Sequence, residues 1–179
     1  MSHRGTRLYF AYGSNMLTAR LRERTPSAVL VGPAVLSNHA LHFHHVSRKD
    51  GSAKCNILPG PAERESVHGV VFDIPAAEQP ALDAAEDRDQ GYQVVDRQVW
   101  LEGESIPVFC YLALPGTIDE QRQPFRWYRD LVLAGAREHG LPARYIERIA
   151  DEPVVEDDDP QRAARHAALI RSDDESSKK

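Results

Sequence analysis

The sequence lacks any long apolar run. Its 179 residues are 41% hydrophobic and 27% charged, and no apolar stretch approaches the roughly 20 residues that span a bilayer. Residues 1–5 lead into no apolar segment followed by a small-residue cleavage site. We therefore expect a cytoplasmic protein without a membrane partner, and the length suits one domain with a buried core.

The chain also contains little cysteine and has no net positive charge. Only Cys55 and Cys110 occur, without the CxxC spacing of zinc knuckles or dithiol redox centres, so we expect two free, largely buried thiols. Neither thiol lies in a glycine-rich or helix-start context that would activate it for catalysis. The formal net charge of -5 argues against nucleic acid as a partner, because binding to phosphates needs a basic face.

What the chain does contain is a short polar loop near its start. An apolar, β-prone run leads directly into Tyr12-Gly13-Ser14-Asn15, and residues 16–21 then have helix-compatible apolar spacing. Glycine, serine and asparagine tolerate unusual dihedral angles and can leave backbone N–H groups free to bind an oxygen anion. A helix start would favour negative charge at the same place. An ordinary strand-to-helix turn has the same composition.

The rest of the chain alternates β ribbons with short helices. Alternating apolar residues between turn residues predict strands at 28–31, 36–46, 55–58, 67–74, 92–101 and 106–114. A turn at Gly32-Pro33 is expected to close the first of these strands. Helix formers with flanking proline or glycine predict helices at 80–86, 124–139 and 142–149.

The composition changes after Pro153. Residues 156–159 are acidic, and the charged ending at 172–179 is expected to be disordered in isolation. Between them, the alanine-rich residues 161–171 predict a short helix that packs on the body or on a neighbouring subunit, which leaves a homodimer open. We therefore divide the chain into a domain, residues 1–153, and an acidic, partly disordered C-terminal tail, residues 154–179.

Glu86 is the candidate for acid–base chemistry. It ends the helix-like residues 82–86, and Gly91-Tyr92 then open a strand. An acidic residue at such a junction can face a cavity, and general acid–base catalysis needs a partly desolvated carboxyl group. A solvated glutamate at the end of an alanine-rich helix explains the same pattern.

Together these pieces resemble the gamma-glutamyl cyclotransferase family. The matching segments are residues 9–16, 67–71, 82–86 with Gly91-Tyr92, Tyr111-Leu112 and 140–145. The resemblance implies an α+β fold, a small mixed β-barrel flanked by helices. It also implies a reaction on a small-molecule γ-glutamyl substrate, whose α-amine attacks its own γ-carbonyl to give 5-oxoproline and release an amine or amino acid. No metal and no cofactor is implied.

The resemblance also implies roles for particular residues. Glu86 matches the catalytic acid/base, which takes a proton from the α-ammonium group and delivers one to the departing nitrogen. The loop would hold the γ-glutamyl group through backbone N–H groups. The implied substrate-binding residues are Tyr12, Gly13, Ser14, Asn15, Met16, Tyr111 and Tyr128. For the two later tyrosines, half-buried aromatic rings with a hydroxyl group in water explain the sequence equally well.

The sequence departs from the family pattern at two positions. Asp87 stands where many relatives have glycine, and His68 stands where an aromatic residue is frequent. The family's tyrosine near residue 92 is also ambiguous between Tyr92 and its neighbour Gln93. We place these changes near the pocket rim, so the leaving group stays open: relatives act on γ-glutamyl amines, glutathione and γ-glutamylated antibiotic intermediates.

Alternatives to a cyclotransferase follow from other features. The departures suggest a non-catalytic binding module for γ-glutamyl or amino-acid-like ligands, and the acidic tail suggests an interaction protein. The histidines at 39, 42, 44 and 45 have the ligand types for zinc or nickel. Exposed histidines on the solvent side of an edge strand explain that cluster better.

Overall fold

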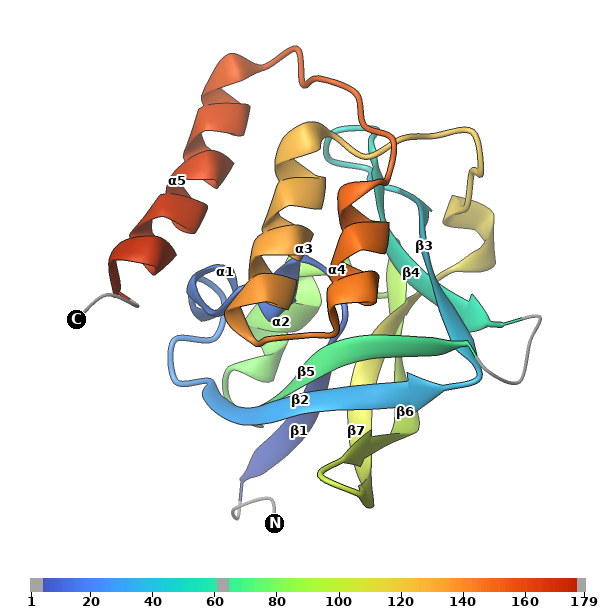
Figure 1. Ribbon diagram of the computed structural model, residues 1–179, viewed down its shortest axis with the longest axis vertical. Helices are drawn as coiled ribbons and strands as arrows, with labels where there is room; N and C mark the ends of the chain where they lie inside the picture. The colour runs from blue at the N-terminus through green and yellow to red at the C-terminus, as the bar shows by residue number, and fades with distance from the viewer. Residues whose placement is uncertain (1–4, 61–64, 177–179) are drawn as a thin grey trace.

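A closed β-barrel forms the centre of the protein, which a computed structural model describes at residues 5–60 and 65–176 (Figure 1). The strands, in their order around the barrel, are β1 (Thr6–Ala11), β5 (Ser66–Pro75), β2 (Val29–Ser37), β6 (Tyr92–Leu101) and β7 (Glu104–Ala113). Neighbouring strands are antiparallel except at the closure, where β1 and β7 run parallel with Tyr9 opposite Phe109. The barrel is therefore mixed, as predicted.

Strand β2 is longer than the sequence predicted. Gly32 and Pro33 do not close it, because the register against β5 shifts between Leu30 and Gly32 and the ladder then continues to Ser37. Such a bulge accommodates glycine and proline by bending a strand without ending it. The predicted turn at Gly32-Pro33 is therefore wrong.

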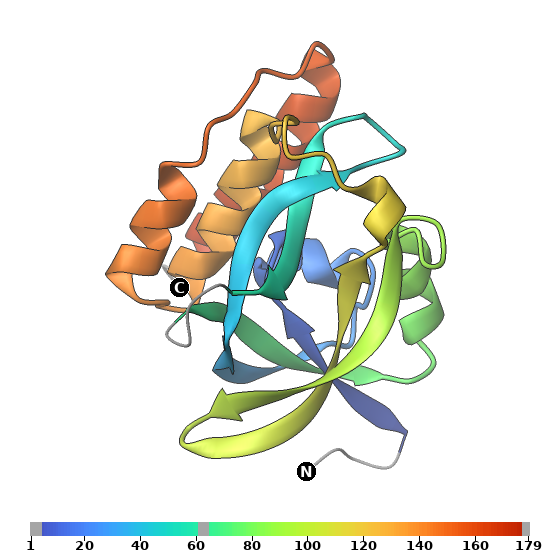
Figure 2. The same cartoon turned by 90° about the vertical axis from the view of Figure 1, so that its right-hand side faces the viewer.

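A two-stranded hairpin stands beside the barrel. It consists of β3 (His39–Val46) and β4 (Ala53–Pro59), and β3 follows β2 through Asn38, whose φ is 59°. Figure 2 shows the hairpin rising from the barrel next to the helices. The hairpin is thus a separate sheet outside the closed ladder of the barrel.

The helices lie outside the barrel, and α3, α4 and α5 lie together on one side of it (Figure 1). They are η1 (Ser14–Met16), α1 (Thr18–Arg22), α2 (Gln79–Ala85), η2 (Pro115–Thr117), α3 (Arg126–Glu138), α4 (Ala143–Ala150) and α5 (Pro160–Ser176). Helix α3 packs directly on η1, because a Cβ atom at Gly135 would lie 2.4 Å from the backbone nitrogen of Leu17. The absence of a side chain at Gly135 therefore sets the position of the loop that follows β1.

Helix α5 includes the alanine-rich segment that was predicted to be helical. It packs on α1 and α3 of the same chain and extends through residues 172–176, while 177–179 lie outside the described residues. The division between domain and tail stays a prediction. Within the described ranges, the helices lack the length and apolar character that crossing a membrane requires.

Candidate active site

The polar loop follows β1, and its last two residues, Ser14 and Asn15, begin η1. Met16 N donates to Gly13 O at 3.0 Å and Leu17 N donates to Ser14 O at 3.3 Å, which forms the single turn of η1. The backbone N–H groups of Gly13, Ser14 and Asn15 have no acceptor among residues 5–60 and 65–176. This geometry matches the expectation of consecutive free N–H groups that can bind an oxygen anion.

Glu86 lies beside this loop, directly after α2. Asn15 Nδ2 donates to Glu86 Oε1 at 2.9 Å and also lies 3.1 Å from the Tyr9 hydroxyl oxygen. Arg24 donates to Asn15 Oδ1. The Asn15 amide is thereby fixed with its nitrogen toward Glu86, since only its oxygen can accept from arginine. The two predicted motifs therefore meet in space, although Asn15 and Glu86 are 71 positions apart.

A small cavity of about 30 Å³ lies between the loop and Glu86, and we call it the inner cavity. Its lining residues are Tyr9, Tyr12, Gly13, Ser14, Asn15, Cys55, Glu86, Tyr92, Tyr111 and Tyr128. They include every predicted site residue except Met16, which is fully buried in the core. Met16 therefore positions the loop from behind rather than facing the cavity.

Gly13 approaches the opposite wall of the inner cavity. A Cβ atom at this position would lie 3.1 Å from Cys55 Cβ and 3.2 Å from the Tyr128 hydroxyl oxygen. These distances are shorter than ordinary van der Waals contacts, so glycine lets the loop approach β4 and α3. Cys55 and Cys110 are free and buried as expected, and burial raises the pKa of each thiol to about 12.

The tyrosines of the inner cavity are buried, and their hydroxyl groups bind protein atoms. Tyr92 donates to Cys55 O at 2.6 Å, and the Tyr128 hydroxyl oxygen accepts from Cys55 N at 3.0 Å. Tyr111 donates to Asp83 Oδ1 at 2.5 Å, while Tyr12 donates to Tyr111 O. Burial raises the pKa of these four hydroxyl groups, and that of the fifth tyrosine, Tyr9, above the ordinary value, so they stay protonated. The half-buried, solvated interpretation of Tyr111 and Tyr128 is therefore wrong.

A larger cavity of about 390 Å³, the outer cavity, shares Ser14, Glu86, Tyr92 and Tyr128 with the inner cavity. Its basic lining residues are Arg20, Arg24, Arg48, Lys49, Lys54, Arg162 and Arg165. Its acidic lining residues are Glu23, Asp50, Glu86 and Asp87. The sequence analysis missed this basic wall, because residues between positions 20 and 165 come together only when the chain folds.

The departures from the family pattern have different structural settings. Asp87 lines the outer cavity with φ of 51°, in the left-handed region where glycine is the ordinary choice. Tyr92, rather than Gln93, faces the cavities. His68 does not lie at the rim: it is on β5 and packs on Tyr145, with 4.9 Å between ring centroids. Its predicted position at the pocket rim is therefore wrong.

The prediction of solvent-exposed histidines is wrong for two of the four residues in the cluster. His44 and His45 are both buried, because a register shift between Phe43 and His45 turns two consecutive side chains inward. His45 Nδ1 lies 2.8 Å from Thr117 Oγ1, and its ring packs on Tyr92. Burial lowers the pKa of His45 to about 4, so this histidine is neutral at pH 7.

Three residues of that region have the donor types of a metal site. The candidate ligand atoms of His42, His44 and Glu120 lie within 4.8 Å of one another. Both nitrogens of His44 already have protein partners, Glu120 Oε1 at 2.7 Å and Asn56 Nδ2 at 3.0 Å. A hydrogen-bond relay that joins β3 to β4 accounts for this arrangement.

Known proteins are similar to this chain over most of its length. A model of the AIG2-like family matches residues 66–149, a segment that includes Glu86 but not the loop. The chain is 36% identical to a gamma-glutamylcyclotransferase of Mus musculus over 155 residues, covering 83% of this chain and 80% of that protein. For the Homo sapiens protein of the same name the identity is 35% over 153 residues, with coverages of 82% and 79%.

The fold agrees with these sequence matches. A solved structure of a gamma-glutamyl cyclotransferase superposes with a TM-score of 0.80 at 26% identity, covering 93% of this chain and 99% of the other. A solved Homo sapiens structure, described as an uncharacterized protein, superposes with a TM-score of 0.78 at 27% identity, with the same coverages. The predicted fold, a mixed β-barrel flanked by helices, is therefore confirmed.

Proposed function

The chain belongs to the gamma-glutamylcyclotransferase family, and on that premise we propose that it is an enzyme that cyclises a γ-glutamyl amino acid, amine or peptide to 5-oxoproline. The α-amine nitrogen of the substrate bonds to its γ-carbonyl carbon, and the bond from that carbon to the leaving nitrogen breaks. One proton leaves the attacking amine and one joins the leaving amine. The products therefore contain all atoms of the substrate, without a co-reactant.

The observation that carries this proposal is the placement of Glu86 where the inner and outer cavities meet. Within the described chain, Asn15 Nδ2 supplies the hydrogen bond to Oε1 of Glu86, and Oε2 has no protein partner. A carboxylate held by one oxygen keeps the other oxygen for the substrate's ammonium group. Glu86 can then accept a proton from the attacking amine and return it to the departing nitrogen.

The loop has the complementary task. Free N–H groups of Gly13, Ser14 and Asn15 can bind the γ-carbonyl oxygen as negative charge develops on it. The γ-glutamyl group would lie against the loop and the tyrosines, with the leaving portion directed into the outer cavity. Because ring closure is intramolecular, holding the amine near its own carbonyl contributes directly to the rate.

Release of 5-oxoproline from γ-glutamyl-alanine, γ-glutamyl amines and glutathione tests the proposal. We expect Glu86→Gln to lower kcat by about 10²- to 10⁴-fold, the usual range for loss of a general acid–base group. Glu147→Gln is the matched control, because Glu147 is exposed on α4 and lines neither the inner nor the outer cavity. Equal activity of the wild type and Glu86→Gln would refute the assignment.

The binding-module alternative has its own result in the same assay. Thermal stabilisation by 5-oxoproline or γ-glutamyl compounds, without release of product from any substrate, would favour a non-catalytic protein. Turnover by the wild type excludes this alternative.

A further inference from the structure

Arg20 is a buried cation without an acidic partner. Its residue is 7% exposed, its Nε donates to Ser14 Oγ at 2.9 Å, and its Nη1 lies 3.2 Å from His166 Nδ1. No carboxylate of the described residues lies within ion-pair distance of its guanidinium group. Because arginine only donates, His166 Nδ1 must accept, which requires a neutral imidazole. A buried charge normally has a counter-ion, so this guanidinium group is suited to an anion from outside the chain.

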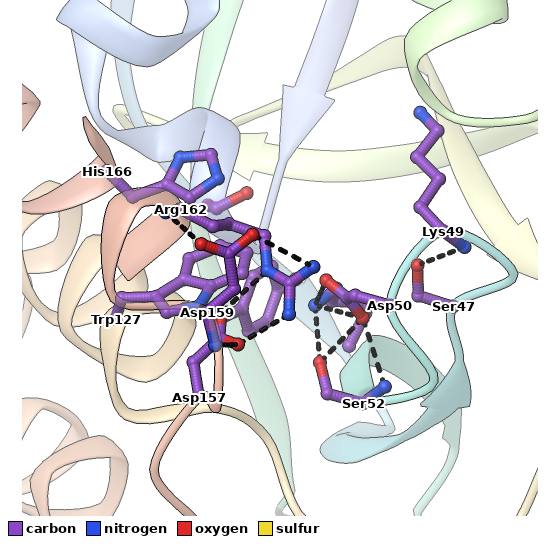
Figure 3. Close-up of polar contacts among 12 residues, drawn as sticks. Ser47, Lys49, Asp50, Ser52, Trp127, Asp157, Asp159, Arg162 and His166 are labelled. Carbon is purple, nitrogen blue, oxygen red and sulfur yellow. Dashed lines mark hydrogen bonds and ion pairs between the residues drawn. The ribbon is translucent and has the colours of Figure 1, made fainter. Parts of the chain in front are cut away.

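Helix α5 holds His166 in this position. The His166 ring stacks on Trp127 of α3, with 4.0 Å between ring centroids and an interplanar angle of 18°. Arg162, one turn earlier, donates from Nε to Asp157 Oδ2 at 2.6 Å, and Trp127 Nε1 donates to the same oxygen at 2.7 Å. Figure 3 shows Trp127, Asp157, Arg162 and His166 gathered in this contact. Helix α5 is therefore attached to α3 through defined polar contacts, and it forms a wall of the outer cavity.

The charges that line the outer cavity are not balanced. Three of the seven basic residues have acidic partners: Lys54 with Asp50, Arg48 with Asp87, and Arg162 with Asp157. The four without an ion-pair partner in the described chain are Arg20, Arg24, Lys49 and Arg165. Among the acidic lining residues, Glu23 and Glu86 are the two that form no ion pair within the described chain. The cavity wall therefore keeps an excess of positive charge after its internal pairs are counted.

We propose that Arg20 and α5 form a carboxylate subsite for the leaving portion of the substrate. Arg20 and Arg165 line the outer cavity but not the inner cavity, so they face the side of Glu86 opposite the γ-glutamyl group. A guanidinium group binds a carboxylate with two parallel hydrogen bonds, which favours amino-acid or peptide leaving groups over amines. This inference rests on the proposed function and names the residues that would select the leaving group.

A pair of substrates that differ only at that carboxylate tests the subsite. We expect the wild type to have a kcat/KM about 10- to 100-fold higher for γ-glutamyl-alanine than for γ-glutamyl-alaninamide, as for loss of a charge-assisted hydrogen bond. Arg20→Gln should remove most of this preference by lowering kcat/KM for the acid, with a smaller effect on the amide. Arg20→Lys should retain part of the preference, because it keeps the charge without the planar fork.

Arg165→Gln keeps the test independent of folding, because Arg165 is exposed on α5. It should lower the preference about 2- to 5-fold through the loss of one nearby charge. The matched control is Arg144→Gln, which removes an exposed arginine of α4 that lines neither the inner nor the outer cavity. An unchanged preference in Arg165→Gln and in every folded Arg20 variant would overturn the subsite.

The wild type alone separates this inference from the proposed function. Equal turnover of the acid and the amide would overturn the subsite and leave the cyclotransferase assignment intact. If the wild type releases no 5-oxoproline from either substrate or from glutathione, the proposed function fails and the subsite fails with it.

Discussion

At the residue scale, Asn15 connects the main parts of the proposed site. Its amide oxygen accepts a hydrogen bond from Arg24, and its amide nitrogen donates to Glu86 and Tyr9. This one side chain therefore connects the loop to the segment after α1 and to Glu86. Hydrogen bonds to charged groups contribute about 1.5–3 kcal/mol, more than neutral pairs contribute. The orientation of Glu86 therefore depends on a residue that takes no proton itself.

Asn15→Leu preserves the approximate volume of the side chain and removes its hydrogen bonds. We expect kcat/KM for 5-oxoproline release to fall about 10- to 100-fold, in line with losing one hydrogen bond to a charged group. Steady-state kinetics test this, and circular-dichroism melting curves show whether the variant is folded. A folded variant with wild-type kcat/KM would contradict the role given to Asn15.

Asp87 gives a prediction about stability. Its φ of 51° costs a residue with a Cβ atom roughly 1 kcal/mol, although aspartate tolerates this region better than most residues. We expect Asp87→Gly to raise the free energy of unfolding by about 0.5–1 kcal/mol and Asp87→Val to lower it by a larger amount. Urea unfolding midpoints measure both changes, and a less stable glycine variant would show that the Arg48 ion pair outweighs the backbone term.

The sequence predicted most residues that line the inner cavity but none of the basic residues that line the outer cavity. The loop and Glu86 were predictable because each lies in a short motif, and the structure brings them together through Asn15. Met16 belongs to the same motif yet faces the core, since motif membership does not determine the direction of a side chain. Arg20 looks like an ordinary solvated residue of a short helix, because its partner His166 is 146 positions away.

At the element scale, the contact between α3 and η1 fixes the position of the loop. A Cβ atom at Gly135 would meet backbone atoms of Met16 and Leu17 at 2.7 Å and 2.4 Å, which a side-chain rotation cannot relieve. The sequence predicted α3 correctly but gave no indication of this close approach. Helix propensity describes residues along one helix and says nothing about what the helix packs against.

Gly135→Ala should therefore destabilise the protein even though alanine is the better helix former. The overpacking cost of about 1–3 kcal/mol is expected to exceed the roughly 1 kcal/mol that alanine gains within a helix. Gly116→Ala is the matched control, because a Cβ atom there meets nothing within 4 Å. Urea denaturation compares the two, and equal midpoints would mean that α3 shifts away from η1 without cost.

At the scale of the whole molecule, the buried His45 and the half-buried His166 predict how stability depends on pH. Burial, the largest cause for both, lowers the pKa of His45 and of His166 to about 4, below the ordinary histidine value of about 6.5. Between pH 4 and 6.5 the unfolded chain therefore binds more protons than the folded chain. The free energy of unfolding should fall as the pH drops through this window, by at most about 1.4 kcal/mol per pH unit for each histidine.

Urea unfolding at pH 7.5, 6 and 5 tests this dependence. The double substitution His45→Gln and His166→Gln should flatten the fall, since glutamine does not titrate and can still accept a hydrogen bond from Arg20. Hydrogen bonds from Arg162 hold the pKa of Asp157 below its ordinary value. Protonation of this carboxyl group therefore affects stability only below the pH window of the histidines. An identical pH dependence in the wild type and the double variant would exclude the histidines as its cause.

The closure of the barrel has a consequence for biosynthesis. Strand β1 leaves the ribosome before the other strands, yet it pairs with β5 and β7, so the barrel cannot close around its loop while β7 is untranslated. The partner that α5 provides for Arg20 emerges later still. A nascent chain therefore carries Glu86 and the loop before it carries the α5 residues that line the outer cavity, and the full cavity wall can form only after α5 is translated. A chain cut short before α5 would keep Glu86 and its loop, but would lack Arg162, Arg165 and His166 from the lining of the outer cavity.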